Sequence, residues 1–229
     1  FVLAFPPALL GRLAVAGELR TTLWTLSLVQ SEAAVAVERF EAAAKLEADV
    51  ARRVKLMFIN SPNNPTSVVA GTDFFKRVVA FALEHQVIVC HDAAYSEIFY
   101  AGRRPASFLE VDGAKDVGIE FHSLSKPFNM TGWRIGFAVG NKQVLAGLGK
   151  VKSNLDSGVF QAVQEAGITA LQSDDQLTDG LRKVYQERRD VLVPGLKKLG
   201  LEVDTPAAAF YVWVAVPKSY TSTSFTAHL

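Results

Sequence analysis

The sequence predicts an α/β protein: a three-layer α/β/α arrangement around a mostly parallel sheet, followed by a smaller α+β C-terminal domain. The apolar runs at 54–59 and 86–91 have strand length without polar alternation, and an amphipathic segment separates them. Such runs are typical of parallel strands covered on both faces by helices. Beyond about residue 145 the pattern changes to long helical stretches and then short apolar runs, which predicts the second domain.

The predicted βαβ unit begins with VKLMFI and is interrupted by the turn sequence SPNNP at 61–65. Thr72 is the expected N-cap of the helix that follows, since Phe75, Val78, Val79 and Ala82 fall on one helical face. Further strands are expected at 118–123 and 134–140. Later helices are expected at 157–171 and 174–199, with short strands at LEVD (201–204) and FYVWVAV (210–216).

Composition argues for a soluble globular protein that acts on small molecules. The chain has 49% hydrophobic and 21% charged residues and a net charge of +1, so no basic face and no nucleic-acid partner are expected. The N-terminal apolar stretch is interrupted by Pro6, Pro7 and Arg12, so neither a membrane span nor a targeting signal is predicted. The single cysteine, Cys90, lies in an apolar run, which suits a buried thiol and a reducing cytoplasm.

Polar residues follow three of the predicted strands. Asn64 follows the first; Asp92 and Tyr95 follow the second; Ser123, Ser125, Lys126 and Arg134 follow the third. In an open parallel sheet the ligand site lies outside the carboxyl ends of the strands, so these residues are expected to meet in one crevice. His91 and His122 lie beside them, and structural roles are expected because no third ligand has metal spacing, so no metal site is predicted.

Three segments carry a resemblance to a known family: SPNNPT (61–66), DAAY (92–95) and SLSKPFNMTGWRIG (123–136). Together they resemble the class I/II aminotransferases of the fold type I pyridoxal-phosphate enzymes. Within that family the chain is most similar to LL-diaminopimelate aminotransferases and their near relatives, through FHSLSKPFNMTGWRIGFAVGN (121–141) and KSNLDSGVFQAVQEA (152–166). The resemblance covers roughly residues 50–217.

The resemblance implies pyridoxal 5′-phosphate as cofactor and a role for each site residue. Lys126 would be the Schiff-base lysine and then the acid/base, and Asp92 would pair with the pyridine nitrogen. Asn64 and Tyr95 would hydrogen-bond the phenolic oxygen of the ring. Ser123, Ser125 and Arg134 would hold the phosphate, for which two hydroxyls and a planar guanidinium are suited. Lys126, Asp92 and Tyr95 are the expected catalytic residues.

The same resemblance implies a reaction and a domain organisation. An amino group would move between an amino acid, such as LL-diaminopimelate or aspartate, and a 2-oxo acid such as 2-oxoglutarate, in a homodimer. Residues 1–50 are expected to be an N-terminal segment that is partly helical through a pattern at 31–53. Residues 51–148 would be a partial cofactor-binding large domain, and residues 149–229 a helical connection and the start of the small domain.

The sequence also departs from the family pattern. Ser67 stands where the family usually has glycine, which would cost backbone freedom if the position needs a positive φ. The family has a phosphate-binding loop and an aromatic ring that stacks on the cofactor. Residues 1–50 of this chain show no counterpart of either. The substrate-carboxylate arginine is expected beyond Leu229, because Arg182, Arg188 and Arg189 do not match it. The chain is therefore expected to be truncated at both ends.

The sequence leaves other functional interpretations open. A truncated and catalytically weak or inactive relative fits the same motifs, as does a pyridoxal-phosphate lyase on the same scaffold. Ser123-Leu124-Ser125-Lys126 also matches the S-x-x-K motif of penicillin-binding proteins and β-lactamases. That reading needs S-D-N and K-T-G motifs as well, and the sequence contains neither.

Overall fold

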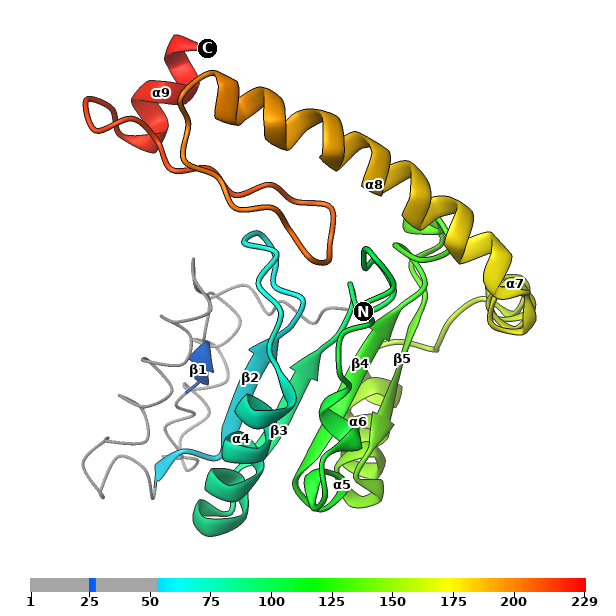
Figure 1. Cartoon of the computed structure of the whole chain (residues 1–229). Helices are drawn as coiled ribbons and strands as arrows, with labels where there is room; N and C mark the ends of the chain where they lie inside the picture. The colour runs from blue at the N-terminus through cyan, green and yellow to red at the C-terminus, as the bar shows by residue number, and fades with distance from the viewer. Residues whose placement is uncertain (1–24, 28–52) are drawn as a thin grey trace.

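A computed structural model describes residues 25–27 and 53–229. The helix expected at 31–53 and most of the segment 1–50 lie outside the described residues. Among the described residues, five strands form one sheet in the order β1-β2-β3-β4-β5 (Figure 1). Their bounds are β1 Thr25–Ser27, β2 Leu56–Asn60, β3 Ile88–Asp92, β4 Gly118–Ser123 and β5 Gly136–Gly140.

The sheet is mostly parallel, as predicted. Strands β1 to β4 run parallel, and β5 at the edge is antiparallel to β4. The predicted bounds of β4 are confirmed, whereas β2, β3 and β5 each begin two residues later than predicted. The register sets Asn60 beside Asp92 and Asp92 beside Phe121, so the polar ends of β2, β3 and β4 lie at the same edge of the sheet.

The described helices are α4 Thr72–His85, α5 Ala114–Val117, α6 Lys142–Leu155, α7 Gln161–Gln172, α8 Asp175–Lys198 and α9 Ser222–His228, with short 3-10 helices η1 Phe108–Glu110 and η2 Thr131–Trp133. The β2–α4–β3 unit confirms the predicted βαβ connection. The prediction that Thr72 caps α4 is wrong: Gly71 occupies the cap position without a side-chain bond, and Thr72 is the first helical residue.

The core lies between α4 and the sheet. Phe75, Met57 and Val89 are fully buried there, and Phe75 packs edge to face on Phe108 with ring centroids 5.8 Å apart. Burying an apolar side chain of this size contributes about 1.5–3 kcal/mol. On the opposite face of the sheet Cys90 and Ile119 are also buried, which agrees with the prediction of strands covered on both faces. Burial raises the pKa of the Cys90 thiol to about 11, as expected for an unreactive thiol.

The C-terminal part is dominated by helices. The prediction for 174–199 is confirmed by α8, which Asp174 caps by accepting a hydrogen bond from the N–H of Gln176. The helix expected at 157–171 begins only at Gln161, and the sequence missed α6, which crosses the predicted domain boundary at 148/149. The predicted strands at 201–204 and 210–216 are wrong, because they share only an isolated antiparallel bridge between Val203 and Val214.

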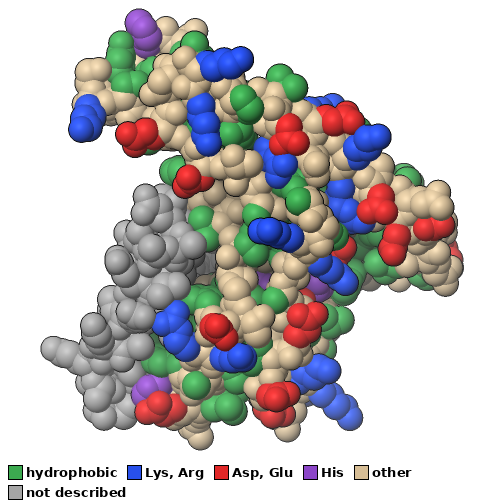
Figure 2. All heavy atoms as spheres, viewed as in Figure 1, with side chains coloured by type: hydrophobic (Ala, Val, Ile, Leu, Met, Phe, Trp, Pro, Cys, Tyr) green, Lys and Arg blue, Asp and Glu red, His purple; other side chains and the backbone are tan. Residues whose placement is uncertain are grey.

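Figure 1 shows α8 extending above the sheet, with the chain returning from it toward the carboxyl ends of β2 and β3. On the face drawn in Figure 2, basic and acidic side chains are interspersed. Among the helices of the described residues, none combines the length and the apolar character needed to cross a membrane.

Candidate active site

The seven predicted site residues line one cleft of about 280 Å³. They come from the ends of β2, β3 and β4 and from the loop before β5: Asn64, Asp92, Tyr95, Ser123, Ser125, Lys126 and Arg134. Asn60, Ala94, Phe121, His122 and Ile135 complete the lining. The expected convergence at the carboxyl edge of the sheet is therefore confirmed, and it follows from the parallel register of β2, β3 and β4.

Asp92 is the acidic group of the cleft. Burial raises the pKa of its carboxyl above the ordinary value, while the N–H of Ala94, which donates to Oδ1 at 3.1 Å, acts in the opposite direction. Its backbone oxygen accepts from Asn60 Nδ2 at 3.0 Å and from the N–H of Ser61 at 3.2 Å. The residue is thus held by its main chain, and no other residue of the described part donates a hydrogen bond to its carboxylate.

Asn60 was missed by the sequence analysis, although it ends β2 beside a turn. Its Oδ1 accepts from the N–H of Asn64 at 2.7 Å, while its Nδ2 bonds the main chain of Asp92. One amide therefore ties the loop that carries Asn64 to the strand that carries Asp92. An asparagine between a strand and a Pro-rich turn is a signal of this kind of side-chain-to-backbone bonding.

Tyr95 joins the β3 loop to a distant segment. Asn64 Nδ2 donates to its hydroxyl at 3.3 Å, and its hydroxyl lies 2.5 Å from that of Tyr211. Burial, together with the bond to Tyr211, raises the pKa of Tyr95, so the phenol keeps its proton at neutral pH. Lys126 Nζ lies 5.7 Å from the centroid of the Tyr95 ring and 5.8 Å from that of Phe210.

Phe210 and Tyr211 were not predicted as site residues, because their apolar run was expected to form a strand. An alternating aromatic and aliphatic run carries the same signal whether it pairs in a sheet or packs against a loop. In the structure Tyr95 packs edge to face against both rings, with centroids 5.4 and 5.3 Å away. The segment 207–212 therefore forms one wall beside the cleft.

The β4–β5 loop arranges the remaining candidates. Ser123 Oγ accepts from the N–H of Ser125 at 3.2 Å, and Thr131 Oγ1 donates to the carbonyl of Ser125 at the same distance. Arg134 has a φ of 54° and donates from Nη1 to the Thr131 carbonyl at 3.0 Å. Since a guanidinium has five N–H donors, Arg134 retains donors for an anion in the cleft.

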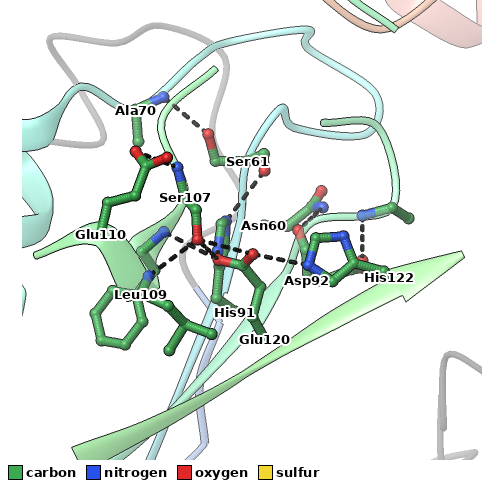
Figure 3. A network of polar contacts seen from close by, with 12 residues as sticks. Asn60, Ser61, Ala70, His91, Asp92, Ser107, Leu109, Glu110, Glu120 and His122 are labelled. Carbon is green, nitrogen blue, oxygen red and sulfur yellow. Dashed lines mark hydrogen bonds and ion pairs between the residues drawn. The ribbon is translucent and has the colours of Figure 1, made fainter. Parts of the chain in front are cut away.

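A buried polar network lies directly behind the cleft (Figure 3). Glu120, 2% exposed, accepts from Nδ1 of His91 and Nε2 of His122, each at 2.8 Å, and from the N–H of Phe108 at 2.9 Å. Ser107 Oγ donates to the same carboxylate at 3.0 Å. Both histidines are thus hydrogen-bonded, as predicted, and the described residues contain no cluster suited to a metal ion.

Burial opposes the ionisation of Glu120, but the hydrogen bonds from His122 and His91 and the charges of these rings outweigh it. They hold the pKa of the carboxyl well below its ordinary value. His91 Nε2 also faces the carbonyl of Ser61 at 3.1 Å. Both ring nitrogens of His91 therefore face oxygen acceptors, the Glu120 carboxylate on one side and the Ser61 carbonyl on the other. The network joins β3, β4 and η1 beneath Asp92.

Ser67 has the positive φ that the sequence analysis considered, with a value of 61°. It is buried, and its hydroxyl donates to the carbonyl of Tyr211 at 2.8 Å. A non-glycine residue in this region costs roughly 1–2 kcal/mol. The hydrogen bond offsets part of that cost and holds Tyr211 against the turn.

Comparison with known proteins agrees with this geometry. Residues 31–229 match the family described as aminotransferase class I and II. The chain is 59% identical over 184 residues to an LL-diaminopimelate aminotransferase from Syntrophobacter fumaroxidans, covering 80% of this chain and 47% of the relative. It is 58% identical over 180 residues to that of Moorella thermoacetica, covering 79% and 46%. The chain thus spans about half the length of these curated relatives.

Solved structures show the same relationship. A substrate-bound BacF structure from Bacillus subtillis aligns with a TM-score of 0.77 and 40% identity, covering 81% of this chain and 47% of that one. A probable N-succinyldiaminopimelate aminotransferase from Thermus thermophilus aligns with a TM-score of 0.74 and 34% identity, covering 80% and 49%. The chain therefore belongs to the class I and II aminotransferases, which are fold type I transferases that depend on pyridoxal 5′-phosphate.

Proposed function

We propose that this chain carries the cofactor-binding core of an aminotransferase that acts on LL-diaminopimelate, aspartate or a similar amino acid with a 2-oxo acid such as 2-oxoglutarate. The observation that carries the proposal is the single cleft lined by all seven predicted side chains. The LL-diaminopimelate aminotransferases among the relatives support the choice of substrate.

The residues of the cleft fit pyridoxal 5′-phosphate. Asp92 presents a carboxylate that only one described N–H contacts, which suits a protonated ring nitrogen. Ser123, Ser125 and Arg134 supply two hydroxyls and a guanidinium for a phosphate. Lys126 is half-buried in the same lining, where its amine can reach an aldehyde. When bound, this cofactor supplies an electron sink for the negative charge at the substrate Cα.

Each side chain has a defined task in this proposal. The Lys126 amine would hold the cofactor and would serve as acid and base for the proton at the substrate Cα. Asp92 would pair with the protonated ring nitrogen of the cofactor. The positive charge of that nitrogen would offset the effect of burial, which raises the pKa of the Asp92 carboxyl. Asn64 and Tyr95 orient donors toward the phenolic oxygen.

The proposal extends to the organisation of the protein. Residues 51–148 would be part of the cofactor-binding large domain, and 149–229 the helical connection and the start of the small domain, with α6 crossing between them. A homodimer in the cytoplasm is proposed from the family resemblance. Size-exclusion chromatography with light scattering tests the dimer, and a mass of one chain would contradict it.

Cofactor binding provides the main test. The 229-residue chain mixed with pyridoxal 5′-phosphate should develop a visible absorption band, and borohydride reduction should fix the cofactor on Lys126 in a peptide map. Lys126→Ala should lose both signals, while the control Lys150→Ala, on an exposed position of α6, should retain them. A colourless wild-type chain, or label on another lysine, would refute the proposed site.

The reaction is tested separately. With LL-diaminopimelate and 2-oxoglutarate, the protein that binds cofactor should form glutamate. Release of ammonia and a 2-oxo acid in place of glutamate would indicate a lyase, and the absence of any product would indicate a catalytically inactive relative.

A further inference from the structure

Tyr211 belongs to the C-terminal segment but is held at the cofactor cleft from several directions. Ser67 donates to its carbonyl at 2.8 Å, and its ring lies 5.0 Å from that of Phe210 and 5.3 Å from that of Tyr95. The segment itself is anchored two residues earlier, where the N–H of Ala209 donates to the carbonyl of Ile98 at 2.7 Å. The position of the Tyr211 hydroxyl is therefore determined by tertiary contacts on both sides of the residue.

The hydroxyl of Tyr95 has a limited number of hydrogen bonds to make. A phenol oxygen donates once and accepts up to twice. Asn64 Nδ2 already donates to it at 3.3 Å, and the Tyr211 hydroxyl lies 2.5 Å away. If Tyr95 donates to Tyr211, its only proton is used and it can offer none to the cleft. If Tyr211 donates, the Tyr95 oxygen accepts two bonds and its proton is left for a ligand.

We propose that Tyr211 is a positioning residue that donates to Tyr95 and thereby directs the Tyr95 proton to the phenolic oxygen of the bound cofactor. This inference rests on the proposed function, since it needs an anionic oxygen in the cleft. That oxygen only accepts, so Tyr95 must donate to it, and the donor in the short contact between the phenols is then Tyr211. Donation from Tyr211 also polarises Tyr95 and strengthens its bond to the cofactor.

The consequence is measurable on the cofactor. A hydrogen-bond donor at the phenolic oxygen of the cofactor stabilises the negative charge of that oxygen. The nitrogen that joins Lys126 to the cofactor then loses its proton more easily. Loss of that donor should raise the pKa of the visible absorption band. Tyr95→Phe removes the donor itself, whereas Tyr211→Phe only weakens it, so the second shift should have the same direction and roughly a third of the size.

The experiment is a spectrophotometric pH titration of the cofactor-loaded 229-residue chain and its variants. Tyr95→Phe and Tyr211→Phe should both raise the pKa of the band, and the double variant should match Tyr95→Phe alone because Tyr211 acts through Tyr95. Tyr220→Phe is the matched control: its ring contacts Phe225 and His228, so the pKa of the band should not change. Thermal unfolding of each variant checks that it is folded.

The outcomes separate this inference from the proposed function. A band that depends on Lys126 and shifts in Tyr95→Phe but not in Tyr211→Phe would overturn the role of Tyr211 and leave the cofactor site intact. A further shift in the double variant would also overturn it, because the effect would then bypass Tyr95. Absence of the band in the wild-type chain would refute the proposed function itself.

Discussion

Glu120 determines how the buried network behind the cleft responds to substitution. Its carboxylate accepts from two histidines, a serine and a main-chain N–H, and every one of these partners donates. Glu120→Gln would point an NH₂ group at some of these donors and leave them without an acceptor. Since each buried donor left without its acceptor costs roughly 1–3 kcal/mol, we expect a loss of about 3 kcal/mol in the free energy of unfolding by urea.

The lowered pKa of Glu120 also predicts that the stability of the protein depends on pH. The pKa of Glu120 in the folded protein lies below its ordinary value of 4.5. The stability that it contributes is therefore complete above that pH and declines as the pH falls below it. Glu120→Gln should show a flatter decline between pH 5 and 3 than the wild type does, while the control Glu165→Gln on an exposed face of α7 should follow the wild type. Parallel curves for Glu120→Gln and the wild type would contradict the assignment.

At the scale of the elements, Gly140 governs how β5 meets β4. It has a φ of +132°, and a Cβ there would lie 2.5 Å from the carbonyl oxygen of Gly118 and 2.9 Å from Ile119 Cα. Gly140→Ala should therefore destabilise the protein by about 2 kcal/mol or more, through backbone strain and displacement of the edge strand. Urea unfolding followed by circular dichroism measures this loss.

Gly149 provides the matched control in the helix that follows. A Cβ at this position in α6 meets nothing within 4 Å. Alanine is favoured over glycine in a helix interior by about 1 kcal/mol, so Gly149→Ala should stabilise the protein slightly. If both glycine substitutions changed the free energy of unfolding in the same direction, the conclusion that the backbone requires glycine at Gly140 would be wrong.

At the scale of the whole molecule, α8 is attached to the rest of the chain through arginines. Arg189 donates from Nη1 to the carbonyl of Pro206 at 3.0 Å, and its guanidinium lies 4.4 Å from the centroid of the Tyr100 ring. Arg182 makes a similar pair of contacts, to the Glu97 carbonyl at 3.2 Å and the Phe99 ring at 4.5 Å. These contacts link the helix to the loop after β3 and to the segment that carries Tyr211.

Arg189→Ala should lower the free energy of unfolding by about 2 kcal/mol, because it removes a charged donor and a cation–π contact. Arg188→Ala, one position earlier on the exposed side of α8, should change it by less than about 0.5 kcal/mol. Arg189→Lys should recover only part of the loss, because an ammonium lacks the planar fork of arginine. Equal losses in the free energy of unfolding for Arg188→Ala and Arg189→Ala would contradict the proposed attachment of α8 through Arg189.

Much of the candidate site was predictable because its residues follow strands. Asn64, Asp92, Tyr95 and Lys126 come after apolar runs, and parallel pairing brings the ends of such runs together whatever the loop details. At Ser67 the sequence raised a cost that applies only if the position needs a positive φ, and its φ of 61° meets that condition. The seven residues could thus be assembled into one cleft before any coordinate was known.

The sequence by itself determined the mostly parallel sheet, the helices α4 and α8 and seven of the residues that line the cleft, because hydrophobic periodicity and strand ends are local signals. Only the tertiary structure decided that Tyr211 meets Tyr95 across 116 positions, and that Glu120 lies between two histidines. No local pattern encodes such contacts. They depend on how the segment 207–212 and the ends of β3, β4 and η1 pack, and packing is a property of the whole chain.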